Sequence, residues 1–162
     1  MTIPTLQHEI KKRRPFESRA EEAYLNLMRS AAVLAGPFER LFRTHGLSEA
    51  TYNVLRILRG EMTGGNEAGL PCQEIAGRMI ALVPDMTRLL DRLEHAGFVE
   101  RERSIDDRRV VFSRITSKGL KSLESLDVPT ATLLAEQFKH MQPAELRELS
   151  RLLEKARQAQ ST

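Results

Sequence analysis

The sequence predicts a mainly α-helical fold with one small β-hairpin, which places the chain in the α+β class. Apolar residues recur at intervals of three and four along most of the chain, which is the period of amphipathic helices. The exceptions are Phe98-Val99 and Val110-Val111-Phe112, two short runs of strand formers joined by a polar loop. Glycine or proline stands at most of the boundaries between these segments.

The composition indicates one compact domain, or one domain with a dimerisation element. The chain has 162 residues, of which 41% are hydrophobic, and its net charge of +3 permits nucleic-acid binding without requiring it. No apolar run approaches the length that crosses a bilayer, and no signal peptide is visible. The single Cys72 excludes an internal disulfide. We therefore expect a cytoplasmic protein without a membrane partner.

The first segment, residues 1–15, carries the basic run Lys11-Lys12-Arg13-Arg14. It is either an arm that contacts phosphates or a partner chain, or a solvated tail. Residues 16–45 have a helical pattern, in which Gly36-Pro37 predicts a kink or a restart. The apolar stripe of this helix could pack against a second subunit and comprises Tyr24, Leu27, Ala31, Leu34, Phe38 and Leu41.

The next helix is expected to begin after Gly46, with Ser48 as its cap, and to extend to about Leu58 or Arg59. Residues 60–69 are rich in glycine and predict a flexible surface loop. They lack the GKS/T ending of a phosphate-binding loop, so we interpret them as a tolerated insertion.

Residues 72–96 predict a helix-turn-helix: a short helix from Cys72 to Met79, a turn at residues 80–82, and a second helix from Val83 to Ala96 that Gly97 ends. The apolar stripe of the second helix is Met86, Leu89, Leu90 and Leu93. Its other side can reach base edges or phosphates in a DNA major groove, although a plain solvated face is the alternative. That side carries Pro84, Arg88, Asp91, Arg92 and His95, flanked by Asp85 and Thr87.

The loop from Ser104 to Arg109 is a candidate wing between the two strand-like runs. Arg109 suits a narrow, electronegative minor groove, and Asp107 could hold its guanidinium through a bidentate pair. The alternative is an exposed turn whose ion pairs contribute little to stability.

Beyond the wing, Thr116 or Ser117 is expected to cap a helix in which Pro129 predicts a bend near residues 127–129. Pro143 is expected to open the last helix. Its leucine stripe, like those of the other terminal helices, exceeds what a small lobe needs for its own core, which predicts a two-fold homodimer. That stripe is Leu146, Leu149, Leu152 and Leu153.

Three motifs together resemble the MarR (multiple antibiotic resistance regulator) family. They are the run from Leu89 through Asp91-Arg92-Leu93-Glu94 to Gly97-Phe98-Val99-Glu100-Arg101, the run Asp106-Asp107-Arg108-Arg109, and Ile115-Thr116-Ser117-Lys118-Gly119. The resemblance covers residues 18 to 158. It implies a winged helix-turn-helix, with a DNA-binding lobe at 47–115 and N- and C-terminal dimerisation helices at 16–45 and 116–162. The chain departs from the family at Leu82-Val83-Pro84-Asp85, where small hydroxyl residues are common, and in its long 60–69 connection.

The family consists of homodimeric regulators, mostly repressors, that bind pseudo-palindromic operators and are often released by small, frequently aromatic ligands. The resemblance therefore implies double-stranded DNA and a second copy as partners. The residues expected to contact DNA are Pro84, Asp85, Thr87, Arg88, Arg92, Arg101, Arg103, Asp107, Arg108, Arg109 and Lys118. A ligand pocket between the dimer helices and the lobe could be lined by Tyr24, Met28, Phe42, His45 and Tyr52.

No catalytic constellation is visible, so we expect neither an enzyme nor a cofactor. The four histidines show no ligand spacing with Cys72, which argues against a metal site. Cys72 at a helix start could be a redox sensor, but a small residue near a cap explains it equally well. The competing function is a winged-helix module that binds protein, which would not need arginines on both the helix and the wing.

Overall fold

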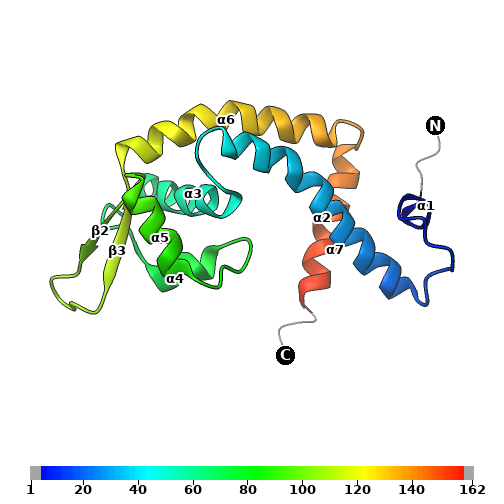
Figure 1. The fold of residues 1–162 in the computed structure, drawn as a ribbon, viewed down its shortest axis with the longest axis horizontal. Coiled ribbons are helices and arrows are strands. Elements are labelled where there is room, and N and C mark those ends of the chain that lie inside the picture. Colours follow the sequence, from blue (N-terminus) through cyan, green and yellow to red (C-terminus); the bar gives the residue numbers. More distant parts are fainter. Residues whose placement is uncertain (1–4, 159–162) are drawn as a thin grey trace.

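The computed structural model describes residues 5–158 and shows helices arranged around a small three-stranded sheet (Figure 1). The elements in chain order are α1 (Leu6–Glu9), α2 (Arg19–Arg43), α3 (Glu49–Thr63), β1 (Leu70–Pro71), α4 (Cys72–Arg78), α5 (Met86–His95), β2 (Val99–Arg103), β3 (Val111–Ile115), α6 (Ser117–Phe138) and α7 (Pro143–Gln158). The mainly helical α+β class is confirmed, as is the hairpin.

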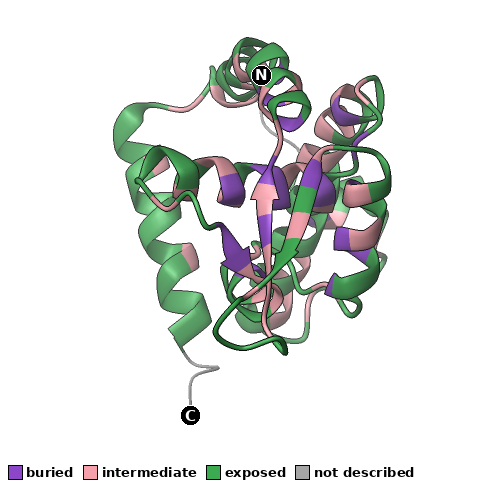
Figure 2. Cartoon of the chain, turned by 90° about the vertical axis from the view of Figure 1, so that its left-hand side faces the viewer, coloured by how far each residue is buried: buried purple, intermediate pink, exposed green. Residues whose placement is uncertain are grey.

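The core lies in the lobe formed by α3, α4, α5 and the sheet, with the first half of α6 packed over it. Figure 2 shows buried positions on part of each strand and on the facing sides of these helices. Helix α5 contributes the stripe that its apolar period predicted, Met86, Leu89, Leu90 and Leu93. The buried side chains include Val54, Leu55, Leu58, Ile75, Leu89, Leu90, Leu93, Val99, Ile115, Leu123 and Leu126.

The sheet has the order β1-β3-β2, and both pairings are antiparallel. Strand β1 was not predicted, because two residues are too short to show an alternating pattern. Gly69 makes this pairing possible: its φ is +81°, and a Cβ atom there would lie 2.2 Å from the Ser113 carbonyl oxygen. Only glycine allows the two backbones to approach this closely.

The predicted end of α3 was wrong by about a turn. Helix α3 continues to Thr63 instead of ending near Leu58 or Arg59, so the glycine-rich connection is helical at its start. Helix α2 is continuous through Pro37, so the helix does not restart there, and α6 is also one continuous helix through Pro129, where a bend was predicted (Figure 1). Tertiary packing of an apolar face outweighs the loss of one backbone donor at each proline.

The N-terminal segment folds back on α2 instead of extending as a solvated tail. Leu6 of α1 is buried, and Lys12 pairs with Glu21 at 3.4 Å and lies over the Phe16 ring. Glu9 reaches Arg29 at 3.6 Å. Residues 1–4, which belong to the predicted arm, lie outside the described part.

A bidentate ion pair joins α3 to α6. The two terminal nitrogens of Arg59 donate to the two carboxylate oxygens of Asp127 at 2.7 and 2.8 Å. This ion pair ties the lobe to α6, the long helix that leads away from it. Thr130 lies about one helical turn beyond Asp127 on α6. The hydrogen bond from Arg59 lowers the pKa of the Asp127 carboxyl.

The N-terminal half of α2 and all of α7 leave their apolar side chains uncovered. Tyr24, Met28 and Val33 on α2 are more than half exposed, and Leu152 on α7 is 48% exposed. Helix α7 has no buried residue among those described. Within residues 5–158, no helix is long and apolar enough to cross a membrane.

We expect Asp127→Asn to lower the free energy of unfolding by about 1 kcal/mol at neutral pH, the size of a half-exposed ion pair. The folded-state pKa of Asp127 is depressed, so its stabilisation is complete above the unfolded pKa of about 3.9 and is lost as pH falls through the folded pKa. Urea unfolding from neutral to acidic pH measures this difference, which should shrink on acidification. Glu154→Gln on α7 is the control, because within the described residues this carboxylate has no ion pair. A constant difference at every pH contradicts the assignment.

Candidate nucleic-acid interface and ligand pocket

Helix α5 begins at Met86, three residues later than predicted, because Asp85 is its cap. The Asp85 carboxylate accepts a hydrogen bond from the backbone N–H of Arg88 at 2.9 Å. Pro84 therefore lies before the helix and not in its first turn, and the segment between α4 and α5 spans residues 79–85. A cap that satisfies an orphan donor prevails over the general preference of proline for a first turn.

The two faces of α5 are divided as its sequence predicted. Met86, Leu89, Leu90 and Leu93 are buried, whereas Thr87, Arg88 and Arg92 are exposed. Gly97, with φ of +73°, ends the helix: its N–H donates to the Glu94 carbonyl at 2.8 Å, and that of Phe98 to the Leu93 carbonyl at 2.9 Å. These two bonds form a Schellman cap.

Arg101, which was predicted to contact phosphate, is paired with two carboxylates of α5. Its guanidinium on β2 donates to Asp91 at 2.6 Å and to Glu94 at 2.9 Å, both on α5. Its side chain is only 24% exposed. Arg101 therefore joins the polar edge of α5 to the hairpin, and Asp91 serves this pair instead of facing DNA.

Lys118, which was predicted to contact phosphate, makes two contacts within the chain. Its ammonium donates to the Ala96 carbonyl at 2.7 Å and lies 4.8 Å from the centre of the Phe98 ring. A cation there satisfies a carbonyl at the negative end of α5. Lys118 lies 22 positions beyond Ala96, so no local spacing in the sequence could have indicated this contact.

The loop at residues 104–110 is held by hydrogen bonds to its own backbone. The Ser104 hydroxyl accepts from the N–H groups of Asp106 and Asp107, and the Asp107 carboxylate accepts from the N–H of Arg109 at 2.9 Å. Asp107 does not hold the Arg109 guanidinium, so the predicted bidentate pair is wrong. Asp107 shapes the loop and leaves the Arg109 side chain exposed.

Five arginines remain exposed on α5 and the hairpin, which lie together at one end of the molecule (Figure 1). In the part of the chain that the structure describes, none of them has a carboxylate within 4 Å. Unpaired guanidinium groups on adjacent elements form a positively charged surface suited to phosphates and base edges. These residues are Arg88, Arg92, Arg103, Arg108 and Arg109.

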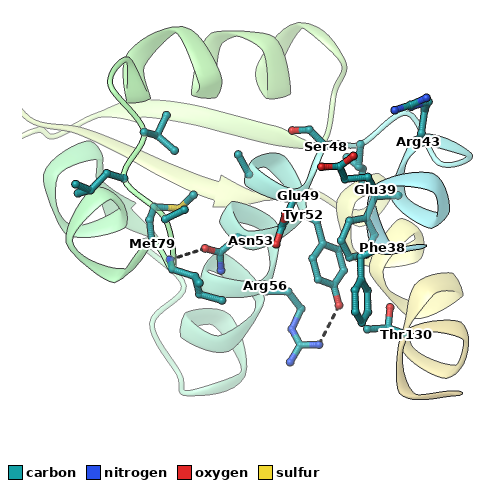
Figure 3. A pocket seen from close by; sticks show the side chains of 17 residues that line it. Phe38, Glu39, Arg43, Ser48, Glu49, Tyr52, Asn53, Arg56, Met79 and Thr130 are labelled. Carbon is teal, nitrogen blue, oxygen red and sulfur yellow. Dashed lines mark hydrogen bonds between the residues drawn. The ribbon is translucent and has the colours of Figure 1, made fainter. Parts of the chain in front are cut away.

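A cavity of about 730 Å³ lies between the end of α2, the start of α3 and the turn before α5 (Figure 3). The Phe42 and Tyr52 rings stack in its wall with centroids 4.1 Å apart. Among the five predicted ligand residues, only these two line the cavity. Tyr24 and Met28 are exposed on the distant half of α2, and His45 contacts Thr44 and the Leu41 carbonyl instead. Residues that the prediction missed include Phe38, Asn53, Arg56, Met79, Ile80 and Thr130.

Asn53 connects this cavity to the turn that leads into α5. Its side-chain oxygen accepts a hydrogen bond from the backbone N–H of Ile80 at 2.9 Å (Figure 3). Both residues line the cavity, and Ile80 belongs to the turn that leads into α5. A change in the cavity wall can therefore shift the start of α5.

Cys72, the first residue of α4, is half-buried against the core, which agrees with a packing role. Between residues 5 and 158, no three His, Cys, Asp or Glu side chains are grouped so that they could hold a metal ion.

Comparison with known proteins gives consistent matches. The MarR family model matches residues 47–111. The crystal structure of a MarR transcription factor from Planctomyces limnophilus is 39% identical, covers 86% of this chain and 98% of that one, and superposes with a TM-score of 0.65. The chain belongs to the MarR family.

The uncharacterised HTH-type transcriptional regulator YkoM of Bacillus subtilis is 31% identical over 70% of each chain. The repressor IacR of Pseudomonas putida is 32% identical over 72% of this chain and 66% of its own.

Solved structures of lower sequence identity share the fold. The Staphylococcus aureus MepR–DNA complex has a TM-score of 0.72 at 18% identity, covering 85% of this chain and 96% of that one. The organohalide-sensing regulator RdhR, crystallised with 2,4-dichlorophenol, has a TM-score of 0.77 at 16% identity, covering 91% and 87%. The winged helix-turn-helix fold is thereby confirmed. YkoM, IacR and RdhR are named as transcriptional regulators.

We expect Arg101→Met to lower the free energy of unfolding by about 1 kcal/mol and to leave the salt dependence of duplex binding unchanged, because Arg101 is occupied by Asp91 and Glu94. Arg103→Met is the matched control: it lies on the same strand and is exposed, so it should reduce the slope of log K against log salt by about 1. Fluorescence anisotropy with a DNA duplex at several salt concentrations measures both slopes. A smaller slope for Arg101→Met would return this residue to the phosphate contacts.

Proposed function

We propose that this MarR-family protein is a homodimeric repressor that binds a pseudo-palindromic operator. The observation that carries the proposal is the set of five exposed, unpaired arginines on α5 and the hairpin, opposite the buried stripe of α5. A module that binds only protein does not require guanidinium groups on both elements. Repression is favoured by the similarity to IacR, which is named as a repressor.

In the proposed complex, α5 enters the major groove. Thr87, Arg88 and Arg92 meet base edges or adjacent phosphates, and Pro84 and Asp85 lie at the leading end of the helix. The Asp85 carboxylate caps α5 by accepting a hydrogen bond from the Arg88 N–H. In the complex it repels phosphate and can accept a further hydrogen bond from the amino group of a cytosine.

The wing occupies the neighbouring minor groove. Arg109 enters it, on a loop whose shape Asp107 maintains, while Arg103 and Arg108 contact phosphates. The duplex is thus held from two adjacent grooves by one lobe.

The second copy covers the apolar surface that the single chain leaves exposed. The uncovered side chains of α2 and α7 form this surface, and the last helix buries none of its described residues alone. A two-fold pair built on these helices presents two recognition helices to successive turns of one duplex face.

The cavity between the lobe and α2 is the proposed site of a small regulatory ligand. Its volume of about 730 Å³ is in the range of small-molecule sites, and Phe42 and Tyr52 supply aromatic surface. The dichlorophenol-bound relative supports a ligand with an aromatic ring. Through Asn53 and Ile80, occupancy of the cavity alters the position of α5.

Selection of bound sequences from random duplexes tests the function directly. We expect an inverted repeat whose half-sites are about one helical turn apart, because both lobes of a two-fold dimer read the same sequence. Recovery of no common sequence, with binding that depends only on salt, would refute sequence-specific regulation.

We expect Arg109→Ala to weaken binding to the selected duplex by about 1 to 3 kcal/mol without changing the melting temperature, because the side chain is exposed and, within residues 5–158, unpaired.

Arg88→Ala should relax base preference at one position of each half-site. Arg151→Ala, on the remote helix α7, is the control for loss of a cation. Equal weakening on every duplex would reduce Arg88 to a phosphate contact.

We expect the double substitution Leu149→Glu and Leu152→Glu to convert the dimer to monomer, because it places two carboxylates in the proposed apolar interface. Sedimentation velocity at micromolar concentration measures the state. Ile105→Glu, which is 96% exposed on the wing, should leave the dimer intact. A wild-type monomer under these conditions is the result that rejects the interface.

A further inference from the structure

Among the described residues, the three most exposed large apolar side chains lie on the elements proposed to face DNA. Leu82 is 99% exposed, Ile105 96% and Ile80 89%. Ile80 and Leu82 belong to the turn before α5, whereas Ile105 stands alone on the loop between β2 and β3. A single exposed apolar side chain is common on protein surfaces, so exposure alone assigns no role to Ile105. The structure of the loop and its charges supply two further observations.

The backbone on both sides of Ile105 is held in place. The Ser104 N–H donates to the Val110 carbonyl, and the Val110 N–H donates to the Asp107 carbonyl, both at 2.9 Å. The Ser104 hydroxyl accepts from the Asp106 N–H at 3.2 Å. Ile105 lies between these anchored positions, and its β-branched side chain has few rotamers. The loop therefore presents a stiff aliphatic group that loses little conformational entropy when a partner buries it.

Arginines flank Ile105 on both sides. Arg103 precedes it, Arg108 and Arg109 follow it, and all three are exposed. Within residues 103–109 these three guanidinium groups outnumber the two carboxylates. A protein partner is usually bound through a contiguous apolar patch, which one isoleucine among charged residues does not form. Duplex DNA offers both phosphates for the guanidinium groups and apolar sugar and base surface in the minor groove, so DNA is the favoured partner.

We propose that Ile105 is a wedge that enters the minor groove beside Arg109 and partly unstacks one base step. Apolar side chains inserted from the minor groove open a step and bend the duplex toward the major groove. This inference rests on the proposed function, in which the wing occupies the minor groove. Pyrimidine–purine steps such as TA unstack most easily, so Ile105 adds a sequence preference without a hydrogen bond to any base.

The position of the hairpin predicts where the opened step lies. The hairpin is at the opposite end of the molecule from α1 and the start of α2 (Figure 1). In the proposed dimer, which is joined through α2 and α7, the two wings are therefore the outermost contacts with the duplex. We expect one unstacked step at each outer flank of the operator, beyond the half-site that α5 reads.

The test uses the duplex selected from random sequences, with 2-aminopurine in place of one flanking adenine at a time. The fluorescence of this base rises when it is unstacked. At saturating concentrations of the full chain, we expect a rise of at least about twofold at one pyrimidine–purine step on each flank. Ile105→Ala should abolish the rise and weaken binding about tenfold, because each of two subunits loses the burial of aliphatic groups. Ile105→Leu should retain the rise.

Leu82→Ala is the matched control, because Leu82 is an equally exposed apolar side chain on the turn before α5. The flank signal should persist in this variant at saturation, whatever its effect on affinity. Replacing a flanking TA step by AA should weaken binding of the wild type about fivefold and leave that of Ile105→Ala unchanged.

A wild-type signal that does not rise on either flank overturns the proposal, even if Ile105→Ala binds more weakly, because the side chain then packs on sugars without opening a step. A rise that survives in Ile105→Ala overturns it as well, since another element then opens the step. Selected flanks without a pyrimidine–purine step also count against the wedge. Equal affinity and equal signal for the wild type and Ile105→Ala would assign Ile105 to a protein partner. All these results leave sequence-specific binding intact, whereas failure to select any common sequence refutes the proposed function and the wedge with it.

Discussion

The guanidinium of Arg101, which lies between the carboxylates of Asp91 and Glu94, joins α5 to the hairpin. Arg101 reaches Asp91 and Glu94, which are three residues apart and therefore lie on the same side of α5. The core packing of Leu89, Leu90 and Leu93 fixes which face of the helix is buried, but apolar contacts are non-directional and allow small rotations. The ion pairs remove this freedom. The ion pairs thereby limit how far the exposed arginines of α5 can move relative to those of the wing, which the proposed binding to two adjacent grooves requires.

Both ends of α5 are also secured. Asp85 caps the first turn, Gly97 closes the last one, and Lys118 satisfies the Ala96 carbonyl from the start of α6. Each contact is worth only about 1 kcal/mol. The first two are local caps of α5, and the third links its end to α6. This distribution of small contacts distinguishes side chains that position the helix from those that are free to bind.

Sequence reasoning found the elements more reliably than the roles of individual charges. Apolar period and glycine stops revealed the helix-turn-helix and the hairpin, because both depend on local spacing. Arg101 and Lys118 were assigned to phosphates because an arginine or lysine near a wing looks the same whether its partner is DNA or a distant carboxylate or carbonyl. The cavity shows the same limit. Phe38 lines the cavity, whereas Tyr24, which belongs to the same predicted stripe of α2, lies elsewhere. A stripe predicts which side of a helix is covered, but it does not show which segment covers each part of it.

The link between Asn53 and Ile80 limits how strongly a ligand in the cavity can act on DNA binding. A ligand shifts an equilibrium only by its difference in affinity for the two arrangements of the turn. One neutral hydrogen bond contributes about 1 kcal/mol, or roughly a fivefold change in an equilibrium constant. In the proposed dimer both turns respond, and two such contributions amount to about thirtyfold in operator affinity. A larger response would require the ligand to move α6 as well, and Arg56, which touches both the cavity and Asp127 of that helix, is the side chain placed to transmit it.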